Sequence, residues 1–417
     1  MSSAYIIGAF STSFGKKPDQ SYKDLTRDAY LGVLADAGLE TGSDIGCGWF
    51  GNTTLYREGQ AGIGGQVLFT PLVQNGLFPE RVPIINVHNA CATGSSAFRG
   101  AYLDIMSGEH DLSLAIGVEK LFDPERSPAE TAEMFSHGID QFDPDQWRDY
   151  YRDAGEIAGK PFDIPDDRSM FMETYAMQAA YHMKTHGTTQ RQFAIAAAKA
   201  HNFGAENPRA QYRFTMTPDE VLADREVSYP LTRAMCAPIG DGAASLLLCS
   251  QKFLEGCDPK VRDRAIKIRA CALSGGKYRR LDEPGLSHVA AQRAYEAAGL
   301  TPSDIDVAEV HDASSFSEIY QIEMMGFCEP GHGGPFVEEG RTSLEGDFPV
   351  NTSGGLVSKG HPVGATGAAM VSELVEQLRG EAGPRQVQNA SIALAESGGG
   401  VVGFDEAVCV VSLLERV

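Results

Sequence analysis

The sequence predicts an α/β protein built from two similar halves. The prediction rests on the length of the chain and on two recurring patterns. The chain has 417 residues, of which 42% are hydrophobic, and its 46 glycines are spread along it. A chain of this composition is globular, and its length suits one large α/β unit or two domains. Two patterns, each joining a helix to a strand, occur twice in the same order. We therefore expect a first half over residues 1–255 and a second half over residues 256–417.

The first recurring pattern is an amphipathic helix, a glycine turn and a strand. It reads AYLGVLADAGLETGSDIGCGWFGN from Ala29 and VAAQRAYEAAGLTPSDIDVAEVHDA from Val289. Apolar residues at helical spacing, followed by glycine and then by a short apolar run, indicate this order of elements. Both copies contain AGL followed by SDI.

The second recurring pattern begins a helix. CATGSSAF starts at Cys91, and GATGAAMV starts at Gly364. Each is followed by a helical pattern that leads into an apolar strand. Because both patterns recur in the same order, the sequence predicts a duplicated α/β fold.

A segment of different composition, residues 121–235, interrupts the first half. It is rich in charged residues, aromatic residues and methionine, as in FDPDQWRDYYRDAGEIAGKPFDIPDDRSMFMETYAMQ. It contains one clear helix, TTQRQFAIAAAKAHNFGAEN, whose N-cap is Thr188 or Thr189. We expect a helical insertion that covers one end of the first half, after which the strand GAASLLLCS returns to the core.

Charge and cysteine content exclude several classes of protein. The net charge of −21 argues against a nucleic-acid partner and against an anionic membrane surface, because both bind basic patches. No stretch approaches the roughly 20 apolar residues of a membrane span. The N-terminus lacks the features of a signal peptide, and LLERV is not a peroxisomal signal. Eight scattered cysteines without a CxxC pair predict neither a disulfide framework nor a zinc site. We expect a cytoplasmic protein without a bound metal.

A reactive cysteine is predicted in NACATGSSAFRG, residues 89–100. Cys91 follows the strand-like run PIINV and precedes a helix, so it lies at a strand-to-helix turn. Unpaired N–H groups and the dipole at a helix N-terminus favour a thiolate, and the small neighbouring residues let a substrate approach closely. The alternative is a small apolar residue in the core, and the residues alone leave both open.

Two histidines are candidates to act with this thiol. His361 lies in the glycine-rich loop NTSGGLVSKGHPVGATGAA, where an imidazole can accept the thiol proton; the alternative is a polar surface residue. His311, in EVHDASSF, follows an apolar strand, and α/β sites form at the carboxyl ends of strands. If the repeat is real, the His361 loop is the counterpart of the Cys91 loop, and the two loops face each other.

The last candidate is the glycine run in AESGGGVVGFDEAVCVV. Gly398, Gly399 and Gly400 can expose backbone N–H groups as an oxyanion hole, and Glu396 stands beside them. A tight turn between two strands is the alternative explanation of these glycines.

These motifs resemble those of the thiolase superfamily over nearly the whole chain. NACATGSSA is similar to the motif of the nucleophilic cysteine, GHPVGATGAA to the Gly-His-Pro motif, and CAPIGDGAASLLL to the stretch that enters the late strands of the first half. HDASSF and the segment around TTQRQFAIAAAKAHNFGAEN are similar to the branch of sterol-carrier-protein thiolases. The resemblance implies a five-layer αβαβα fold, and a homodimer or a dimer of dimers.

The resemblance also implies roles for the candidate residues. Cys91 would accept the acyl group of a coenzyme A thioester, His361 would activate the thiol, and His311 would help stabilise the thioester or enolate oxygen. The backbone N–H groups of Cys91 and Gly398 would form the oxyanion hole. Acyl-CoA enters as a substrate, so the resemblance implies no permanently bound cofactor. Some relatives work with a small OB-fold or zinc-ribbon companion protein, and such a protein is a candidate partner.

The sequence departs from the thiolase pattern at the second acid/base. In the sterol-carrier-protein branch a cysteine occupies the position of Ala313, and in most other thiolases a cysteine occupies the position of Glu396. Three hypotheses stay open. The chain is a thiolase that uses Glu396 as acid/base, an acyltransferase or lyase that does not need the second cysteine, or an acyl-CoA-binding protein. A carboxylate can serve as acid/base if burial raises its pKa.

The insertion is expected to shape the acyl pocket and to meet coenzyme A. Its apolar candidates are either pocket or core residues, and its cations either bind phosphates or are surface charges. The apolar candidates are Phe171, Met172, Tyr175 and Met177, and the cationic candidates are Lys184, Arg191, Lys199, Arg209 and Arg213.

Overall fold

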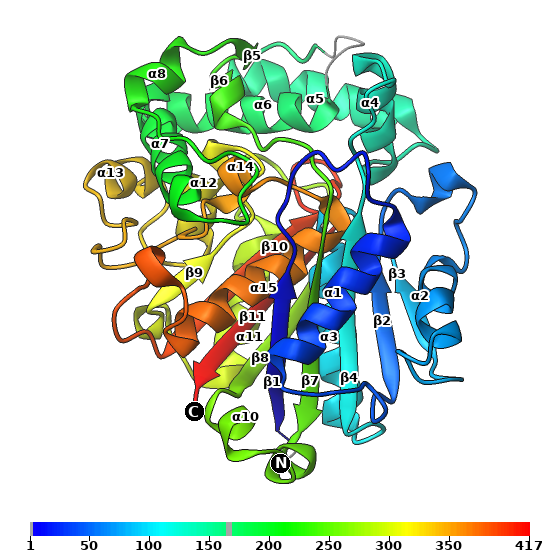
Figure 1. Cartoon of the computed structure of the whole chain (residues 1–417). Helices are drawn as coiled ribbons and strands as arrows, with labels where there is room; N and C mark the ends of the chain where they lie inside the picture. The colour runs from blue at the N-terminus through cyan, green and yellow to red at the C-terminus, as the bar shows by residue number, and fades with distance from the viewer. Residues whose placement is uncertain (1–2, 164–168) are drawn as a thin grey trace.

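The computed structural model describes residues 3–163 and 169–417 and centres on a nine-stranded mixed sheet (Figure 1). The strand order is β3-β2-β4-β7-β1-β8-β11-β10-β9. The strands are β1 (Ala4–Ser11), β2 (Cys47–Gly51), β3 (Ile84–Val87), β4 (Leu112–Glu119), β7 (Gly242–Ser250), β8 (Ile266–Gly275), β9 (Val307–Glu309), β10 (Ile392–Gly399) and β11 (Val408–Arg416).

The sheet consists of two parts that join only at one end of β1. Strand β1 pairs with β7 from Ala4 to Ser11, but it pairs with β8 over only the three residues Ala4 to Ile6. The first part is β3-β2-β4-β7-β1, and the second part is β8-β11-β10-β9. Each part has antiparallel strands next to this junction and a parallel pair farther out. This division agrees with the predicted duplication of an α/β unit.

Helices fill the space between the two parts and cover both outer faces. Side chains of the two central helices pack with residues of both sheet parts in one buried cluster, while separate clusters lie under the outer helices. The layers are therefore α, β, α, β, α, and the predicted fold class is confirmed. The central helices are α3 (Thr93–Ser107) and α15 (Val363–Arg379), and the outer helices are α1 (Tyr22–Asp36), α2 (Gly64–Gln74), α11 (Leu286–Ala298) and α12 (Ser315–Met324).

The second recurring pattern lies where α3 and α15 meet. A Cβ at Gly94 would lie 2.9 Å from the backbone N of Ala368, and a Cβ at Gly367 would lie 2.4 Å from the backbone N of Ser95. Both glycines occupy the same position in CATG and GATG. The repeat in the sequence therefore has a physical cause, because the two helices approach backbone to backbone and any side chain there would clash.

The insertion lies across one end of the molecule, at the top of Figure 1, opposite the two chain termini. Its helix α7 begins with a capping box at Thr189 rather than Thr188. We expected it to cover the first half, but α7 packs on helices of the second half, because its alanine-rich face shares a core with Phe316 and Ile319 of α12. Residues 164–168 of the insertion lie outside the described residues. Its elements are α4 (Pro128–Phe135), α5 (Pro144–Ala158), α6 (Met170–His186), α7 (Gln190–Glu206), α8 (Pro218–Ala223), β5 (Glu226–Ser228) and β6 (Leu231–Thr232).

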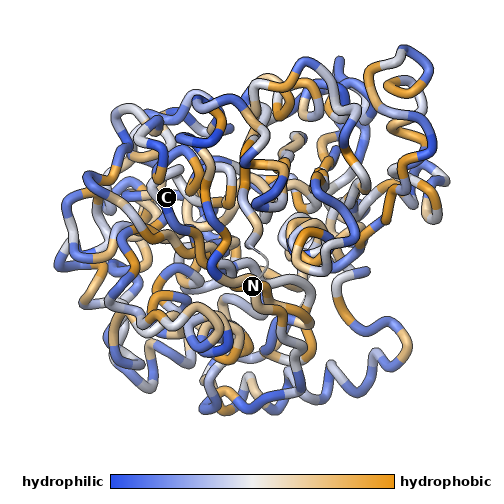
Figure 2. The backbone as a smooth tube through the Cα atoms, turned by 90° about the horizontal axis from the view of Figure 1, so that it is seen from below, coloured by the Kyte–Doolittle hydropathy of each residue, from blue (hydrophilic) through white to orange (hydrophobic). Residues whose placement is uncertain are grey.

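Hydrophilic residues are spread over outer loops on all sides of the molecule (Figure 2). Within residues 3–163 and 169–417, no helix has both the length and the apolar character that crossing a bilayer requires. The remaining α-helices are α9 (Gln251–Glu255), α10 (Pro259–Asp263), α13 (Gly333–Glu338) and α14 (Gly355–Lys359), and the 3₁₀ turns are η1 (Leu55–Glu58), η2 (Ala90–Ala92), η3 (Ser136–Gly138), η4 (Arg233–Met235), η5 (Pro302–Asp304) and η6 (Gly383–Arg385).

Candidate active site

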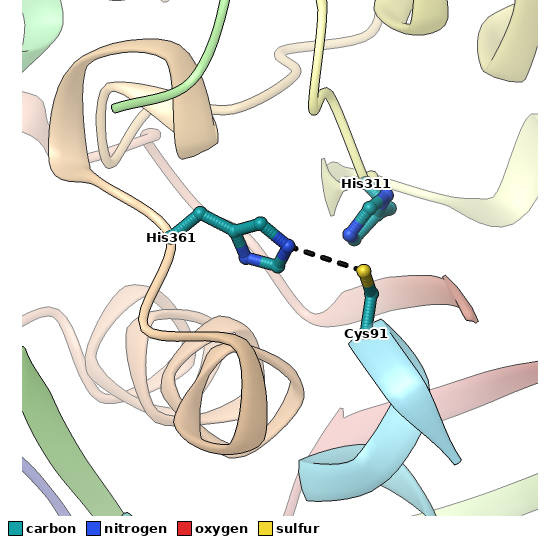
Figure 3. A group of neighbouring side chains, drawn as sticks. All are labelled: Cys91, His311 and His361. Carbon is teal, nitrogen blue, oxygen red and sulfur yellow. Dashed lines mark hydrogen bonds between the residues drawn. The ribbon is translucent and has the colours of Figure 1, made fainter. Parts of the chain in front are cut away.

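Cys91 lies at the turn between β3 and α3, in the short element η2. The preceding residue, Ala90, has a φ of +46°, in the left-handed region that side chains rarely adopt. Strain of this kind is stored where a side chain must be presented in a fixed direction. The thiol faces the loop that carries His361 (Figure 3).

His361 follows Gly360, whose φ is +101°, and lies just before α15. Its Nε2 is 3.2 Å from the Cys91 Sγ, and its Nδ1 is 2.7 Å from the Thr366 Oγ1 (Figure 3). The Thr366 hydroxyl donates its only proton to the Pro362 carbonyl oxygen at 3.1 Å. It therefore accepts a hydrogen bond from Nδ1–H, which leaves the lone pair of Nε2 directed at the thiol.

His311 follows β9, and its ring lies beside both the Cys91 sulfur and the His361 ring (Figure 3). Its ring centroid is 5.1 Å from that of His361, and its Nε2 is buried without a hydrogen-bond partner among the described residues. The ligand atoms of His311, His361 and Cys91 all lie within 4.8 Å of one another. The structure thus brings together the three side chains that the sequence singled out.

Burial keeps all three groups uncharged at rest. It raises the pKa of Cys91 to about 12, against hydrogen bonds from the backbone N–H groups of Gly400 and Cys91 itself. Burial, and then the neighbouring His311, hold the pKa of His361 well below its usual value. Burial lowers the pKa of His311 to about 4. The resting state is a thiol beside two neutral imidazoles, so a base must take the proton as the sulfur reacts.

The three glycines of the run, Gly398, Gly399 and Gly400, line the small cavity together with Cys91. The backbone N–H of Gly400 acts to lower the pKa of the Cys91 thiol, and that of Gly398 acts to lower the pKa of Glu396. Gly398 lies at the end of β10, opposite Cys409 of β11.

Glu396 is fully buried beneath the site. Its Oε2 accepts a hydrogen bond from the His311 backbone N–H at 2.9 Å, and its Oε1 lies 3.4 Å from the Cys409 Sγ. Burial and then the charge of Glu406 raise the pKa of Glu396 to about 8. The carboxyl group is therefore mostly protonated at neutral pH, and backbone and thiol contacts occupy its oxygens.

Three cavities meet at Cys91, and Phe171 borders all three. The wide cavity, of about 700 Å³, extends past Thr54, His88, Met134, Ile139 and Val408. The cationic cavity, of about 560 Å³, includes Lys16, Arg126, Tyr212, Ala237 and Ala313. The small cavity, of about 30 Å³, includes His311, Gly398, Gly400, Gln321 and Glu406. Glu396 lines none of these three cavities.

The apolar residues predicted for the acyl pocket divide between pocket and core. Phe171, Met172 and Tyr175 line the cationic cavity. Met177 instead packs in a buried cluster with Tyr151 and neighbouring side chains of α5. Phe171, Met172 and Tyr175 therefore stay candidates for a substrate pocket, whereas Met177 is a core residue.

The cations predicted for coenzyme A do not line the three cavities. Lys199 donates to Glu318 at 2.6 Å, and Arg209 pairs with Glu376, so both are engaged inside the protein. The others are exposed on the insertion: Lys184, Arg191 and Arg213. Sequence reasoning missed two cations that do line the cationic cavity, Lys16 and Arg126.

A buried carboxylate, also missed from the sequence, connects the loops of the two halves. Glu119 ends β4 and accepts hydrogen bonds from the backbone N–H groups of Thr53, Thr54 and Gly364 at 3.0, 3.2 and 2.9 Å. An acidic residue directly after the apolar run LSLAIGV was its only signal in the sequence. It fixes the start of α15, and so the His361 loop, against the first half.

Two family models match the chain. The model of the thiolase N-terminal domain matches residues 4–225, and the model described as thiolase C-terminal domain-like matches residues 285–412. The chain is 36% identical over 408 residues to an acetyl-CoA acetyltransferase of Methanothermobacter thermautotrophicus, covering 95% of this chain and 96% of that protein. It is 34% identical over 425 residues to human sterol carrier protein 2, covering 97% of this chain and 72% of that protein.

Solved structures agree on the fold. The aldolase described as Ltp2-ChsH2(DUF35) superposes with a TM-score of 0.76 at 21% identity, over 99% of this chain and 98% of that chain. Human mitochondrial 3-ketoacyl-CoA thiolase superposes with a TM-score of 0.68 at 14% identity, over the same shares of both chains. With both thiolase domains and acetyltransferase relatives that match over nearly their full length, the chain is an acyltransferase enzyme and belongs to the thiolase family.

Proposed function

We propose that the protein transfers acyl groups from coenzyme A thioesters through an acyl-Cys91 intermediate. The observation that carries this proposal is the contact of 3.2 Å between the Cys91 Sγ and the Nε2 of His361. Thr366 fixes the tautomer in which Nε2 is the acceptor. A thiol beside an oriented neutral imidazole is the arrangement of a nucleophile and its base.

The chemistry follows from this geometry. As the Cys91 sulfur attacks the thioester carbonyl carbon, the thiol proton moves to His361. The developing oxyanion is stabilised by the backbone N–H groups of Cys91 and Gly398. The coenzyme A thiolate then leaves and takes the proton back from His361. Gly398 lines the small cavity together with Cys91, which supports the assignment of its N–H group to the oxyanion hole.

The cavities suggest how the substrate lies. Coenzyme A carries phosphates, and the cationic cavity is lined by Lys16 and by Arg126, which also lies 3.6 Å from the carboxylate of Asp123. The pantetheine arm would follow this cavity to Cys91, and the acyl chain would extend into the wide cavity beyond Phe171. His311 lines the small cavity, which also reaches Cys91, and its free Nε2 can donate to the thioester or enolate oxygen.

Intact-protein mass spectrometry tests the function. The protein is incubated with acetyl-CoA and with a medium-chain acyl-CoA, beside Cys91→Ala and a matched variant, Cys236→Ala, which alters another thiol of the cationic cavity. We expect an acyl adduct on the wild type and on Cys236→Ala, and none on Cys91→Ala. An adduct that survives in Cys91→Ala contradicts the proposal. If no protein forms an adduct, a pull-down for a companion protein decides whether a second subunit is needed.

Oligomeric state and metal content are further parts of the proposal. Strand β3 lies at the edge of the sheet, and its Ile85 is 41% exposed. Exposed edges of this kind pair with a second copy, so we expect a dimer, which the mass of the protein in solution tests.

A thiolate and two imidazoles can also hold zinc. We expect no metal, so chelator treatment leaves the rate of Cys91 acylation unchanged.

A further inference from the structure

The hairpin that joins β10 to β11 places a second carboxyl group beside the site. The side chain of Glu406 lies over Gly398, where a Cβ would be 2.4 Å from the Glu406 Cγ and 3.2 Å from its Oε1. Gln321 of α12 donates from Nε2 to the same Oε1 at 3.1 Å. Gly398 therefore leaves the room that Glu406 occupies, and Gln321 orients the carboxyl group.

Glu406 and Cys91 line the same small cavity, together with His311. The volume of about 30 Å³ is enough for one small group. Three other atoms at its wall are buried polar atoms without a partner among the described residues: the Nε2 of His311, the Oε1 of Gln321 and the hydroxyl oxygen of Tyr320. Buried polar atoms are normally hydrogen-bonded, so this cavity is built to receive a polar, reacting part of a substrate.

The hairpin is held rigidly. Arg279 is 2% exposed, its Nε lies 2.8 Å from the Oδ1 of Asp405, and it donates to the Phe404 carbonyl oxygen at 3.1 Å. The hydroxyl of Tyr151 donates to the carbonyl oxygen of Gly403. A reacting group is effective when its supporting residues fix its position, and Glu406 satisfies this condition.

We propose that Glu406 carries the proton at the α-carbon of the second acyl-CoA, the task that a cysteine performs in other thiolases. This inference rests on the acyl-Cys91 function proposed above. The sequence pointed to Glu396 for this task, but its carboxyl group contacts the His311 N–H and Cys409 and lines none of the three cavities. Burial raises the pKa of Glu406 as well, which brings its basicity closer to that of a general base at neutral pH.

The step balances as follows. The Glu406 carboxylate takes a proton from the α-carbon of the second acyl-CoA, and the electron pair of that C–H bond forms a C–C bond to the carbonyl carbon of acyl-Cys91. The C–S bond to Cys91 then breaks, and the thiolate leaves. Glu406 releases its proton to solvent and the Cys91 thiolate takes one up, so that Glu406 is again a carboxylate and Cys91 a thiol. Thiolytic cleavage runs the same transfers in reverse.

Exchange of the α-protons of acetyl-CoA in D₂O, followed by NMR, tests the assignment. The variants are Glu406→Gln and the matched Glu396→Gln, both of which keep the shape of the side chain. Acylation of Cys91, measured by intact-protein mass spectrometry on the same samples, reports that the first half-reaction and the fold are intact. We expect the exchange rate of Glu406→Gln to fall at least about 10²-fold, while that of Glu396→Gln stays within about threefold.

Each outcome has one meaning. Loss of exchange in Glu406→Gln alone, with Cys91 acylation retained, supports Glu406. Exchange retained in Glu406→Gln, or lost in both variants, overturns the assignment to Glu406. A wild type that acylates Cys91 without any exchange also overturns it and leaves the acyltransferase function standing. Absence of acyl-Cys91 in the wild type instead contradicts the function proposed above.

Discussion

The Cys91 loop and the His361 loop are two versions of one structural unit. In each loop a histidine stands three residues before the first residue of the repeat: His88 before Cys91, and His361 before Gly364. The first loop puts a thiol at the repeat position and leaves His88 at the wide cavity. The second loop puts glycine there and directs its histidine at the thiol of the first.

The two loops also differ in burial. Residues 84–91, which comprise β3 and the segment up to Cys91, are half-buried or exposed. Residues 351–371, which comprise the His361 loop, α14 and the start of α15, are buried throughout. In the proposed function Cys91 is the nucleophile and must meet its substrate, and its loop borders three cavities. His361 is the proposed base and must keep one tautomer and one position, and its loop is enclosed and hydrogen-bonded. The difference in burial therefore matches the two proposed roles.

The largest effect is expected from removing the base. His361→Ala should slow acylation of Cys91 by about 10³-fold or more, because general-base catalysis contributes about 10²- to 10⁴-fold and the thiol stays protonated with a pKa of about 12. Single-turnover acylation by acetyl-CoA measures it. His88→Ala is the matched control, since it removes the counterpart histidine of the first loop and should change the rate by less than about tenfold. Equal losses would show that the two loops do not divide the tasks.

A smaller effect is expected when the tautomer of the base is released. Thr366→Val keeps the shape of the side chain but removes the acceptor of the His361 Nδ1–H. Acylation should slow by about 10- to 10²-fold, a part of the full contribution of the base. Thr366→Ser, which restores the hydroxyl, should recover most of the rate. If Thr366→Val acylates as fast as the wild type, the hydrogen bond to Thr366 does not orient His361.

The contact between α3 and α15, the helices that follow the two loops, can be tested by measuring the stability of the fold. Gly367→Ala places a Cβ 2.4 Å from the backbone N of Ser95, and overpacking of this kind costs about 1–3 kcal/mol. Urea unfolding measures the loss. Gly62→Ala is the matched control, because a Cβ at Gly62 meets nothing within 4 Å. Equal stability of the two variants would mean that α3 and α15 separate without cost.

The fold was predictable because its causes are local. The helix-turn-strand pattern and the CATG/GATG pair reflect the periodicity of elements and the small residues at Gly94 and Gly367, where two helix backbones touch. The positions of Cys91 and His361 followed from the same repeat, since symmetric loops in a duplicated fold face each other. The insertion was harder to place, because the residues on which α7 packs come more than one hundred positions later.

The remaining site residues depend on contacts that no local pattern encodes. Lys16 lies far from the insertion in sequence and reaches the cationic cavity only in the folded chain. Gly398, Gly399 and Gly400 all line the small cavity at Cys91, so the identity of these residues does not show which N–H group serves the site. Glu396 and Glu406 both lie near the glycine run in the sequence. Only the folded hairpin shows that the Glu396 carboxyl group contacts the His311 N–H, whereas Glu406 lines the small cavity.

The smallest expected effect is a shift in pH dependence. A base with a lowered pKa loses activity only when the pH falls below that lowered value, so the acid limb of Cys91 acylation should lie below about 6.5, the ordinary value for histidine. The neighbouring imidazole of His311 is one cause of the lowering. In His311→Asn the acid limb should therefore move upward, while the maximal rate falls through the loss of the donor to the substrate oxygen. The measurement is the single-turnover rate against pH, with circular dichroism to confirm that both proteins stay folded. An acid limb at or above pH 6.5 in the wild type would mean that water reaches His361 and that the enclosure of its loop does not set its basicity.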